Sequence, residues 1–259
     1  KKERSKCIDL GNRPPPLRTM LLVVLLSACA AARVHAAEIP TIPSAPRLEG
    51  TGVVNVDTTL SLIEATVNLG GFAFKTRAFN GTIPGPTLRL RRGDTVRVKV
   101  ENRLDRTHCG FAAGEAVANG EINTLRDACV TNLHTHGLHV SSSAPADDVN
   151  IQIKPGEAYQ YEYDIPADHQ GGTHWYHPHH HGSTAVHVDG GASGLIIIED
   201  DDADELPPAI RTMPEKAILL TAISGDVAEF EEESGGSWIT AVPPGAPLLF
   251  ANGVSEGTL

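Results

Sequence analysis

The sequence is poor in aromatic residues, in sulfur-containing residues and in long hydrophobic runs. Aromatics make up 5% of its 259 residues, and it contains four cysteines and two methionines. The apolar run from Met20 to Leu26 is far shorter than the roughly 20 residues that a membrane-spanning helix needs. Four cysteines are too few for a small disulfide-dense scaffold. These shortages exclude a membrane-spanning protein and leave a globular protein whose core comes mainly from aliphatic residues.

Basic residues are also scarce after the first 37 positions. Residues 38–259 contain 14 Lys or Arg against 30 Asp or Glu, a net charge of −16. A protein that binds nucleic acid needs a basic surface to neutralise phosphates. We therefore expect no nucleic-acid partner. A hydrophobic fraction of 41% is enough to bury a core.

Residues 1–37 are predicted to be an export signal and an upstream segment rather than part of the fold. Basic residues precede the short apolar run, and Ala36 or Ala37 offers a small residue for cleavage. The run Leu26-Ser27-Ala28-Cys29 also resembles a lipoprotein box, in which Cys29 would carry a lipid anchor. Both kinds of processing stay open, and both predict a secreted or periplasmic protein with no membrane span.

Cys109 and Cys129 are the two cysteines outside this leader, and they flank a segment rich in Gly and Ala. In an oxidising compartment they could form a disulfide worth about 3 kcal/mol for a loop of this length. The alternative is a pair of free thiols. The export signal favours the disulfide.

Short segments of alternating polarity, separated by Gly and Pro turns, predict an all-β protein with no long amphipathic helix. Gly70-Gly71 separates the first two segments and predicts a hairpin. Residues 80–86 are predicted to be a tight turn, because their prolines cannot serve a central ladder. The predicted strands are residues 59–67, 72–79, 95–102, 158–165 and 194–199. We expect them to form a β-sandwich, with 95–102 as an antiparallel strand.

Two regions follow from this pattern. Residues 48–205 are predicted to be one domain, closed by an acidic, proline-containing linker. A new apolar segment at 217–223 then begins a second set of strands. Residues 206–259 are too few for a complete domain, so we expect a linker and the truncated start of a second domain.

Two histidine pairs suggest a metal site. His134 and His136 alternate along one segment, and His177 and His179 along another, so each pair points to one face of an extended chain. Imidazoles with no nearby thiolate suit copper or a catalytic metal better than a closed structural zinc site. The alternative is a solvated histidine-rich loop that binds metal only loosely.

The motifs Asn132-Leu133-His134-Thr135-His136-Gly137 and Gly172-Thr173-His174-Trp175-Tyr176-His177-Pro178-His179 resemble the two amino-terminal copper-binding motifs of the multicopper oxidases, the family of laccases and bilirubin oxidases. Residues 80–87, 92–94 and 190–195 are also similar to that family's first domain. The resemblance implies a cupredoxin-like Greek-key β-sandwich, with the start of a second cupredoxin domain. It also implies a trinuclear copper cluster shared between the first and last domains.

The resemblance assigns roles to individual residues. It implies that His134 binds the type 2 copper and that His136, His177 and His179 bind the type 3 pair. It also places a proton-relaying carboxylate at Asp147 or Asp148, with Asp147 slightly preferred; a solvated acid in a polar turn is the alternative. The remaining histidines nearby are not expected to be ligands: His139, His174, His180, His181 and His187.

The family's type 1 copper uses a His-Cys-His segment that this sequence lacks. We therefore expect an amino-terminal fragment that is inactive by itself. The whole enzyme would couple one-electron oxidation of a phenolic, pigment or metal-ion donor to four-electron reduction of dioxygen to water. The main alternative is a non-catalytic periplasmic copper-binding protein of cupredoxin type. A copper nitrite reductase is disfavoured, because its first domain carries the type 1 cysteine.

Overall fold

The computed structural model describes residues 41–42, 55–69, 72–106, 127–199, 206–213, 215, 217–223 and 248–252. Within these ranges the chain is almost entirely strand and loop, with helices of only six and four residues. No helix among these residues is long and apolar enough to cross a membrane. The predicted leader, residues 1–37, lies outside the described residues.

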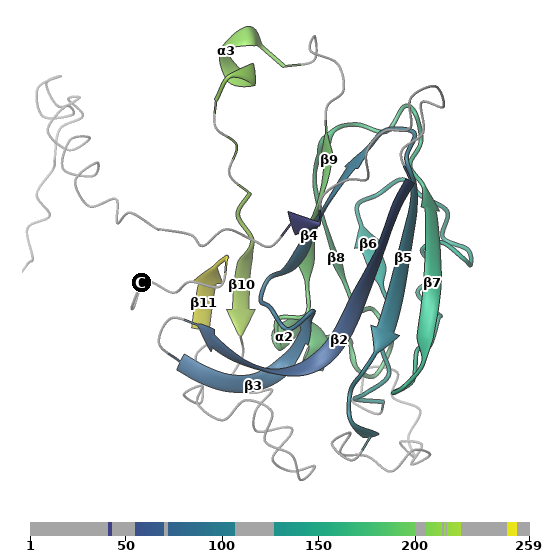
Figure 1. Ribbon diagram of the computed structural model, residues 1–259, viewed down its shortest axis with the longest axis vertical. Helices are drawn as coiled ribbons and strands as arrows, with labels where there is room; N and C mark the ends of the chain where they lie inside the picture. The colour runs from purple at the N-terminus through teal and green to yellow at the C-terminus, as the bar shows by residue number, and fades with distance from the viewer. Residues whose placement is uncertain are drawn as a thin grey trace, which may run out of the picture. The chain divides into compact units, whose positions relative to one another are not determined.

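The strands form two main sheets and one separate pair (Figure 1). The first sheet has the order β3-β2-β5-β7, the second has the order β1-β4-β9-β8-β6, and β10 pairs with β11. The bounds of the strands and helices are β1 Thr41–Ile42, β2 Asn55–Leu69, β3 Phe72–Phe79, β4 Gly85–Arg91, β5 Thr95–Asn102, β6 His134–His136, β7 Ala158–Asp164, β8 Gly172–His177, α2 Thr184–Asp189, β9 Gly194–Glu199, α3 Pro208–Arg211, β10 Leu220–Ile223 and β11 Leu248–Ala251.

The four-stranded sheet confirms most of the predicted pairing. Strands β2 and β3 are antiparallel, as the Gly70-Gly71 hairpin predicted. Strand β5 was predicted to be antiparallel, which is correct for its pairing with β7 but wrong for its pairing with β2, which is parallel. Its alternation places Val96, Val98 and Val100 in the core, at most 1% exposed.

Strand β4 was not predicted from the sequence, and the predicted turn at 80–86 is wrong at its end for that reason. The turn ends earlier, because Gly85 and Pro86 already belong to β4, which runs parallel to β9. The pairing register shifts between Gly85 and Leu88. Pro86 lies within this irregularity, where its missing N–H interrupts no regular ladder bond.

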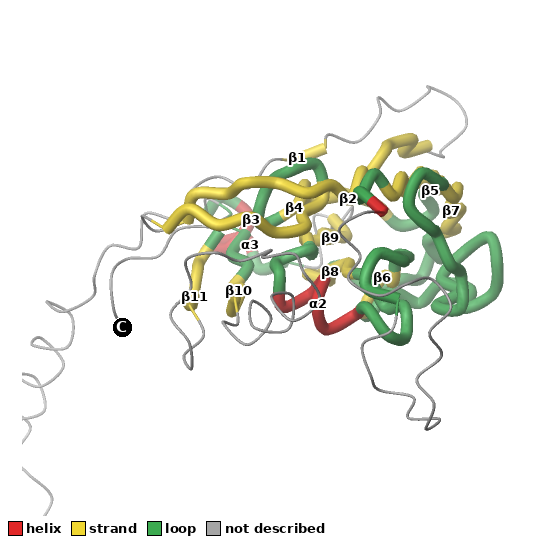
Figure 2. The backbone as a smooth tube through the Cα atoms, turned by 90° about the horizontal axis from the view of Figure 1, so that it is seen from below, coloured by secondary structure: helices red, strands yellow, loops and turns green. Residues whose placement is uncertain are grey.

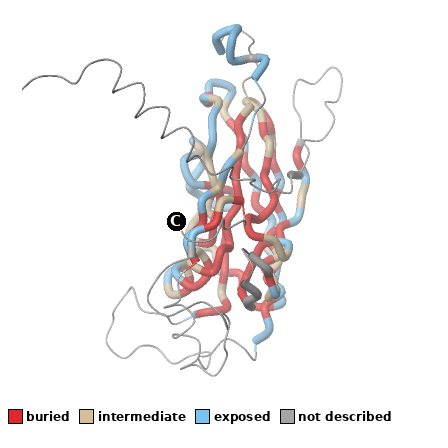
Figure 3. The backbone as a smooth tube through the Cα atoms, turned by 90° about the vertical axis from the view of Figure 1, so that its left-hand side faces the viewer, coloured by how far each residue is buried: buried red, intermediate tan, exposed pale blue. Residues whose placement is uncertain are grey.

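The core lies between the two main sheets, and buried positions recur along their strands (Figure 3). It includes Tyr161 and Tyr163 from β7, which are at most 2% exposed. Tyr176 of β8 packs edge-on against Phe79 of β3, with ring centroids 5.5 Å apart. The all-β sandwich that the sequence predicted is thus confirmed.

The segment predicted to open a second set of strands contains β10, which pairs antiparallel with β11. The acidic run at 200–205 is outside the described residues. A second domain in residues 206–259 stays a prediction.

Candidate metal centre

Three of the four histidines lie on adjacent strands at one edge of the five-stranded sheet, and His179 follows directly after the second strand. Strand β6 carries His134 and His136 and lies beside β8 (Figure 2), and the two strands pair antiparallel. Three cross-strand pairs set the register: His134 with His177, Thr135 with Tyr176, and His136 with Trp175. Because side chains alternate along a strand, both histidines of β6 share a face with His177 and Trp175 of β8.

Three of the predicted ligands converge on one point. A ring nitrogen from each of His134, His136 and His177 lies within 4.8 Å of the others. The closest pair is Nδ1 of His136 and Nε2 of His177, 3.3 Å apart. Neighbouring imidazole nitrogens at this spacing suit a shared cation. A loose surface cluster of histidines would not need this arrangement.

His179 completes the group just after β8 ends. Its ring centroid lies 5.1 Å from that of His134 and 5.8 Å from that of His177. Its Nδ1 is buried and has no hydrogen-bond partner among the described residues. A buried polar nitrogen of this kind costs free energy unless something binds it, and an ion is one such partner.

Hydrogen bonds determine which nitrogen each histidine presents. Nδ1 of His134 is 2.7 Å from a carboxylate oxygen of Asp147, and the other oxygen accepts the backbone N–H of Thr135 at 2.8 Å. Nδ1 of His177 donates to the carbonyl of Pro178 at 2.9 Å. Both rings therefore leave Nε2 available for a metal, as expected when a second group fixes the tautomer of a ligand.

Asp147 and Asp148, which the sequence left open, have different contacts. The contacts of Asp147 are to His134 and to the backbone of β6. The side chain of Asp148 accepts hydrogen bonds from the backbone and side chain of Asn150. Only the first can orient a histidine of the cluster.

The electrostatics favour neutral imidazole at the centre of the group. The pKa of His177 is lowered to about 4, mainly by burial and in part by the nearby His134, His179 and His136, while the hydrogen bond to Pro178 acts in the opposite direction. A neutral ring can donate its lone pair to a metal without first losing a proton.

The other histidines have different surroundings. His180 is buried with Nε2 3.3 Å from Asp127, and His181 is exposed. His187 is fully buried and donates from Nε2 to the carbonyl of Ala128 at 2.9 Å. None of these belongs to the group of converging nitrogens.

Sequence reasoning missed two residues next to the site. The amide of Asn132 and the ring of His169 are both buried, and both bond to segments that flank the histidine strands. Asn132 lies two positions before His134 within the quoted motif, which was a usable signal. His169 belongs to no motif, and only the fold reveals its position.

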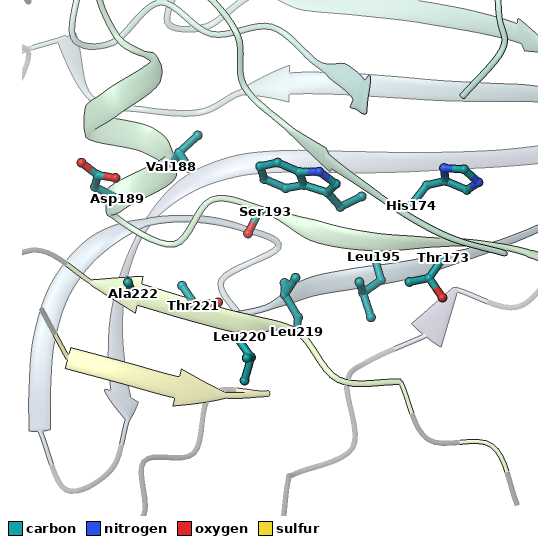
Figure 4. Close-up of a pocket in the computed structure, with 11 residues that line it drawn as sticks. Thr173, His174, Val188, Asp189, Ser193, Leu195, Leu219, Leu220, Thr221 and Ala222 are labelled. Atoms are coloured by element: carbon teal, nitrogen blue, oxygen red, sulfur yellow. The ribbon is translucent and has the colours of Figure 1, made fainter. Parts of the chain in front are cut away.

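A pocket of about 440 Å³ lies beside the site. Asp189 and Val188 of α2 lie at one end and Thr173 and His174 of β8 at the other, with residues 219–222 along one side (Figure 4). Trp175 also lines the pocket, and its ring stacks on His177 with centroids 4.1 Å apart and on His136 at 5.1 Å. This tryptophan therefore separates the pocket from the imidazoles.

Cys129 is disulfide-bonded. Its partner lies outside the described residues, as does Cys109, so the predicted pairing of the two stays a prediction. Because Cys129 is bonded, it is not one of the two free thiols that the alternative prediction required.

The structural comparisons define the fold class. The chain is similar to a multicopper oxidase called mgLAC, with a TM-score of 0.53 and 22% identity over 78% of this chain and 55% of that one. It is also similar to a blue copper oxidase from Nitrosomonas europaea, with a TM-score of 0.51 and 21% identity over the same shares. At these identities the likeness shows the fold, an all-β sandwich of the cupredoxin-like type.

The family follows from a match over more than half of the sequence. The family model described as multicopper oxidase matches residues 64–109 and 111–203, which include every residue of the candidate site. The chain belongs to the multicopper oxidase family.

Individual relatives agree with this assignment. The chain is 32% identical over 138 residues to the multicopper oxidase mco of Staphylococcus aureus, covering 53% of this chain and 25% of the relative. It is 29% identical over 163 residues to copper resistance protein A of Escherichia coli, covering 61% and 21%. It is 33% identical over 127 residues to laccase-1 of Thanatephorus cucumeris, covering 48% and 18%. The chain thus matches about a quarter or less of each of these relatives.

Proposed function

We propose that this chain supplies four histidine ligands to a copper cluster in a secreted or periplasmic oxidase. In this assignment His134 binds the type 2 copper, and His136, His177 and His179 bind the type 3 pair. The enzyme would oxidise a phenolic, pigment or metal-ion donor one electron at a time and reduce dioxygen to water. The observation that carries the proposal is the convergence of three imidazole nitrogens within 4.8 Å inside the segment that matches the family.

The residues present fit copper. Imidazole is a preferred ligand for copper, and no thiolate lies in the group. Nδ1 of His134 and Nδ1 of His177 are already bonded, so each ring presents Nε2 to the group, and Nε2 of His177 faces Nδ1 of His136 at 3.3 Å. The unpartnered Nδ1 of His179 shows that this ring, too, is not saturated by the surrounding protein. The remaining ligands of a trinuclear cluster, and the type 1 copper, would come from outside the described residues.

Copper held here would supply redox chemistry with dioxygen, and the chain's own residues would prepare the site for it. Asp147 holds His134 through Nδ1 and anchors to the backbone of β6, which fixes the direction of Nε2. Its carboxylate can also pass protons toward reduced oxygen, the role that the family resemblance implies. Trp175 covers one side of two imidazoles and excludes water from that side.

Two further parts of the proposal concern the whole protein. Export to a secreted or periplasmic location is supported by the pattern of residues 1–37 and by the disulfide at Cys129, because disulfides persist in oxidising compartments. A second cupredoxin domain beginning in residues 206–259 is supported by the extra strand pair β10 and β11.

The first test measures copper in the purified chain by metal analysis. We expect His134→Ala and His177→Ala each to lower bound copper strongly, because each removes a converging nitrogen. His181→Ala is the matched control, since His181 is exposed and outside the converging group. Equal losses in all three variants would show an unspecific histidine cluster and defeat the proposal.

The second test addresses the oxidase activity. Oxygen uptake with a phenolic donor should be measured on the native gene product and on its His134→Ala variant. The proposal expects donor-dependent uptake that the substitution abolishes. Copper binding without any oxygen uptake would favour the non-catalytic copper-binding protein instead.

A further inference from the structure

Strand β6 is poorly supported by its own ladder. It has three residues, and among the described strands it pairs with β8 alone, at the edge of the five-stranded sheet. A strand this short makes few backbone hydrogen bonds, and register is weakly specified where pairing is limited. Yet two of the four proposed ligands, His134 and His136, belong to it. Something beyond the ladder must hold this strand against β8.

The first support lies just before β6. Asn132 is fully buried, and its side-chain oxygen accepts the backbone N–H of His179 at 2.6 Å. Its side-chain nitrogen donates to the carbonyl of Val149 at 2.7 Å, two residues after Asp147. One amide therefore joins the start of β6 to the chain that follows β8 and to the loop that carries the orienting carboxylate.

The second support lies just after β6. His169 is 3% exposed, and its Nε2 accepts the backbone N–H of His139 at 3.1 Å. Its Nδ1 donates to the carbonyl of Gln170 at 2.7 Å. Because Nε2 is the acceptor, the ring must be the neutral tautomer with hydrogen on Nδ1. This side chain joins the end of β6 to the segment that leads into β8.

We propose that Asn132 and His169 are positioning residues that clamp the two ends of β6 to the two ends of β8. They set the relative placement of the histidine pairs, including the 3.3 Å approach of His136 Nδ1 to His177 Nε2. The inference rests on the proposed copper site. It adds that two non-ligand residues determine the geometry of that site.

The arrangement explains why two side chains are needed. A clamp at one end would let the other end of a three-residue strand move, whereas clamps at both ends fix its position along β8 and its distance from β8. Metal sites tolerate errors of only about 0.2 Å in ligand distance. Small movements of β6 would therefore weaken metal binding even if the sandwich stayed folded.

The test compares two buried asparagines in the purified chain. Asn132→Leu removes the clamp at the start of β6. Asn102→Leu is the matched control, because Asn102 is also buried and its amide also both donates and accepts: it donates to the carbonyls of Cys129 at 2.6 Å and Ile153 at 2.8 Å, and it accepts the N–H of Leu104 at 3.1 Å. Both variants should lower the melting temperature. Each variant is then titrated with Cu(II) in an isothermal titration calorimeter. The dissociation constant should rise about 10- to 100-fold in Asn132→Leu and should stay at the wild-type value in Asn102→Leu.

A second pair of variants tests His169 and serves if Asn132→Leu does not fold. His169→Phe removes the acceptor for the N–H of His139, and we expect Cu(II) binding to weaken. His169→Gln keeps an acceptor at a similar reach and should restore most of the affinity. Rescue by glutamine but not by phenylalanine would identify the hydrogen bond, rather than the volume of the ring, as the cause.

The outcomes separate this inference from the proposed function. Wild-type chain that binds no Cu(II), or binds it without His134 and His177, would defeat the proposed function. Wild-type binding through those histidines, with Asn132→Leu and His169→Phe as tight as wild type, would overturn the clamp. Equal weakening by Asn102→Leu would also overturn it, because the effect would then reflect only the stability of the fold.

Discussion

At the scale of single residues, two imidazole rings of the candidate site use Nδ1 for a hydrogen bond and present Nε2 to the histidine group. Nδ1 of His134 is hydrogen-bonded to Asp147, and Nδ1 of His177 is hydrogen-bonded to the carbonyl of Pro178. This hydrogen bond fixes both the tautomer and the plane of the ring, so Nε2 points in a defined direction. A histidine held by packing alone would lack this control of direction.

Asp147→Asn should weaken Cu(II) binding without unfolding the chain. The amide keeps the size of the carboxylate, but it cannot accept from both His134 and the N–H of Thr135, so one hydrogen bond is lost. We expect about a 10- to 100-fold loss of affinity, measured by calorimetric titration. Asp148→Asn is the neighbouring control, because the side-chain contacts of Asp148 are to Asn150. If both variants bind equally well, Asp147 does not orient the ligand.

His187 should make the stability of the chain depend on pH. Burial lowers its pKa well below the ordinary value, as does the nearby Arg77, while its bond to the carbonyl of Ala128 acts in the opposite direction. Below about pH 6.5, His187 becomes protonated in the unfolded chain but stays neutral in the folded chain. Stability contributed by the neutral ring is therefore present above pH 6.5 and is lost as the pH falls, by about 1.4 kcal/mol per pH unit for one group.

Urea unfolding of the metal-free chain between pH 7 and pH 5 measures this slope. His187→Gln, which can still donate to Ala128, should flatten it, and the exposed His181→Gln should not. The half-buried His174 and the buried His177 also have lowered pKa values, so some slope should remain in the variant. An unchanged slope in His187→Gln would contradict the prediction.

At the scale of the elements, alternation of polar and apolar residues was enough to predict the strands that are long enough to show several repeats of it. Strand β5, with valine at every second position, and β7, with its alternating tyrosines, are examples. Strand β4 was missed because Gly85 and Pro86 at its start are turn residues in most contexts, and here a register shift accommodates them. The parallel pairing of β2 with β5 depends on the topology of the chain, which local pattern does not encode.

The grouping of the histidines was predictable from the sequence, but the residues that support it were not. The two histidine motifs singled out His134, His136 and His177, and the structure brings their nitrogens within 4.8 Å. Their role as copper ligands stays a prediction. The choice between Asp147 and Asp148 depended on which carboxylate a loop turns toward β6, and the sequence spacing allowed both. His169 contacts His139 across 30 positions of sequence, and no local pattern connects them.

Close packing between strands β8 and β9 gives a prediction at this scale. A Cβ added at Gly194 would overlap the ring of Tyr176, which is fully buried and donates to the carbonyl of Pro86 at 2.7 Å. Gly194→Ala should therefore destabilise the chain by about 1–3 kcal/mol, measured by urea unfolding. It should also weaken Cu(II) binding, because Tyr176 precedes His177 on the same strand.

Gly93→Ala is the control for this substitution. Gly93 has a φ of +79° but open space around it, so the variant reports backbone strain alone, about 1 kcal/mol. It should leave Cu(II) binding unchanged, since Gly93 lies in the turn between β4 and β5. If Gly194→Ala lowers the free energy of unfolding by no more than Gly93→Ala does, then Tyr176 can move aside and the prediction is wrong.

At the scale of the whole described molecule, the hydrophobic core and the metal centre are separate. The core cluster is built from hydrophobic residues of both sheets, such as Val98 of β5 and Ile196 of β9. The histidine strand β6 lies at a sheet edge, so a metal bound there would not be needed to close the sandwich. This differs from small metal domains, in which binding the ion supplies the folding free energy.

The chain should therefore fold without metal and gain stability when copper binds. After treatment with a chelator, circular dichroism should still show the β-sheet spectrum and a cooperative thermal transition. Free Cu(II) at about 100 times its dissociation constant should then add about 2.7 kcal/mol of stability, seen as a higher melting temperature by calorimetry. The double variant His134→Ala/His177→Ala should melt cooperatively without metal but show no copper-dependent shift, because the ions would have lost two converging ligands. Unfolding of the wild-type chain by chelation alone would mean that the metal centre, and not the buried core, holds the two sheets together.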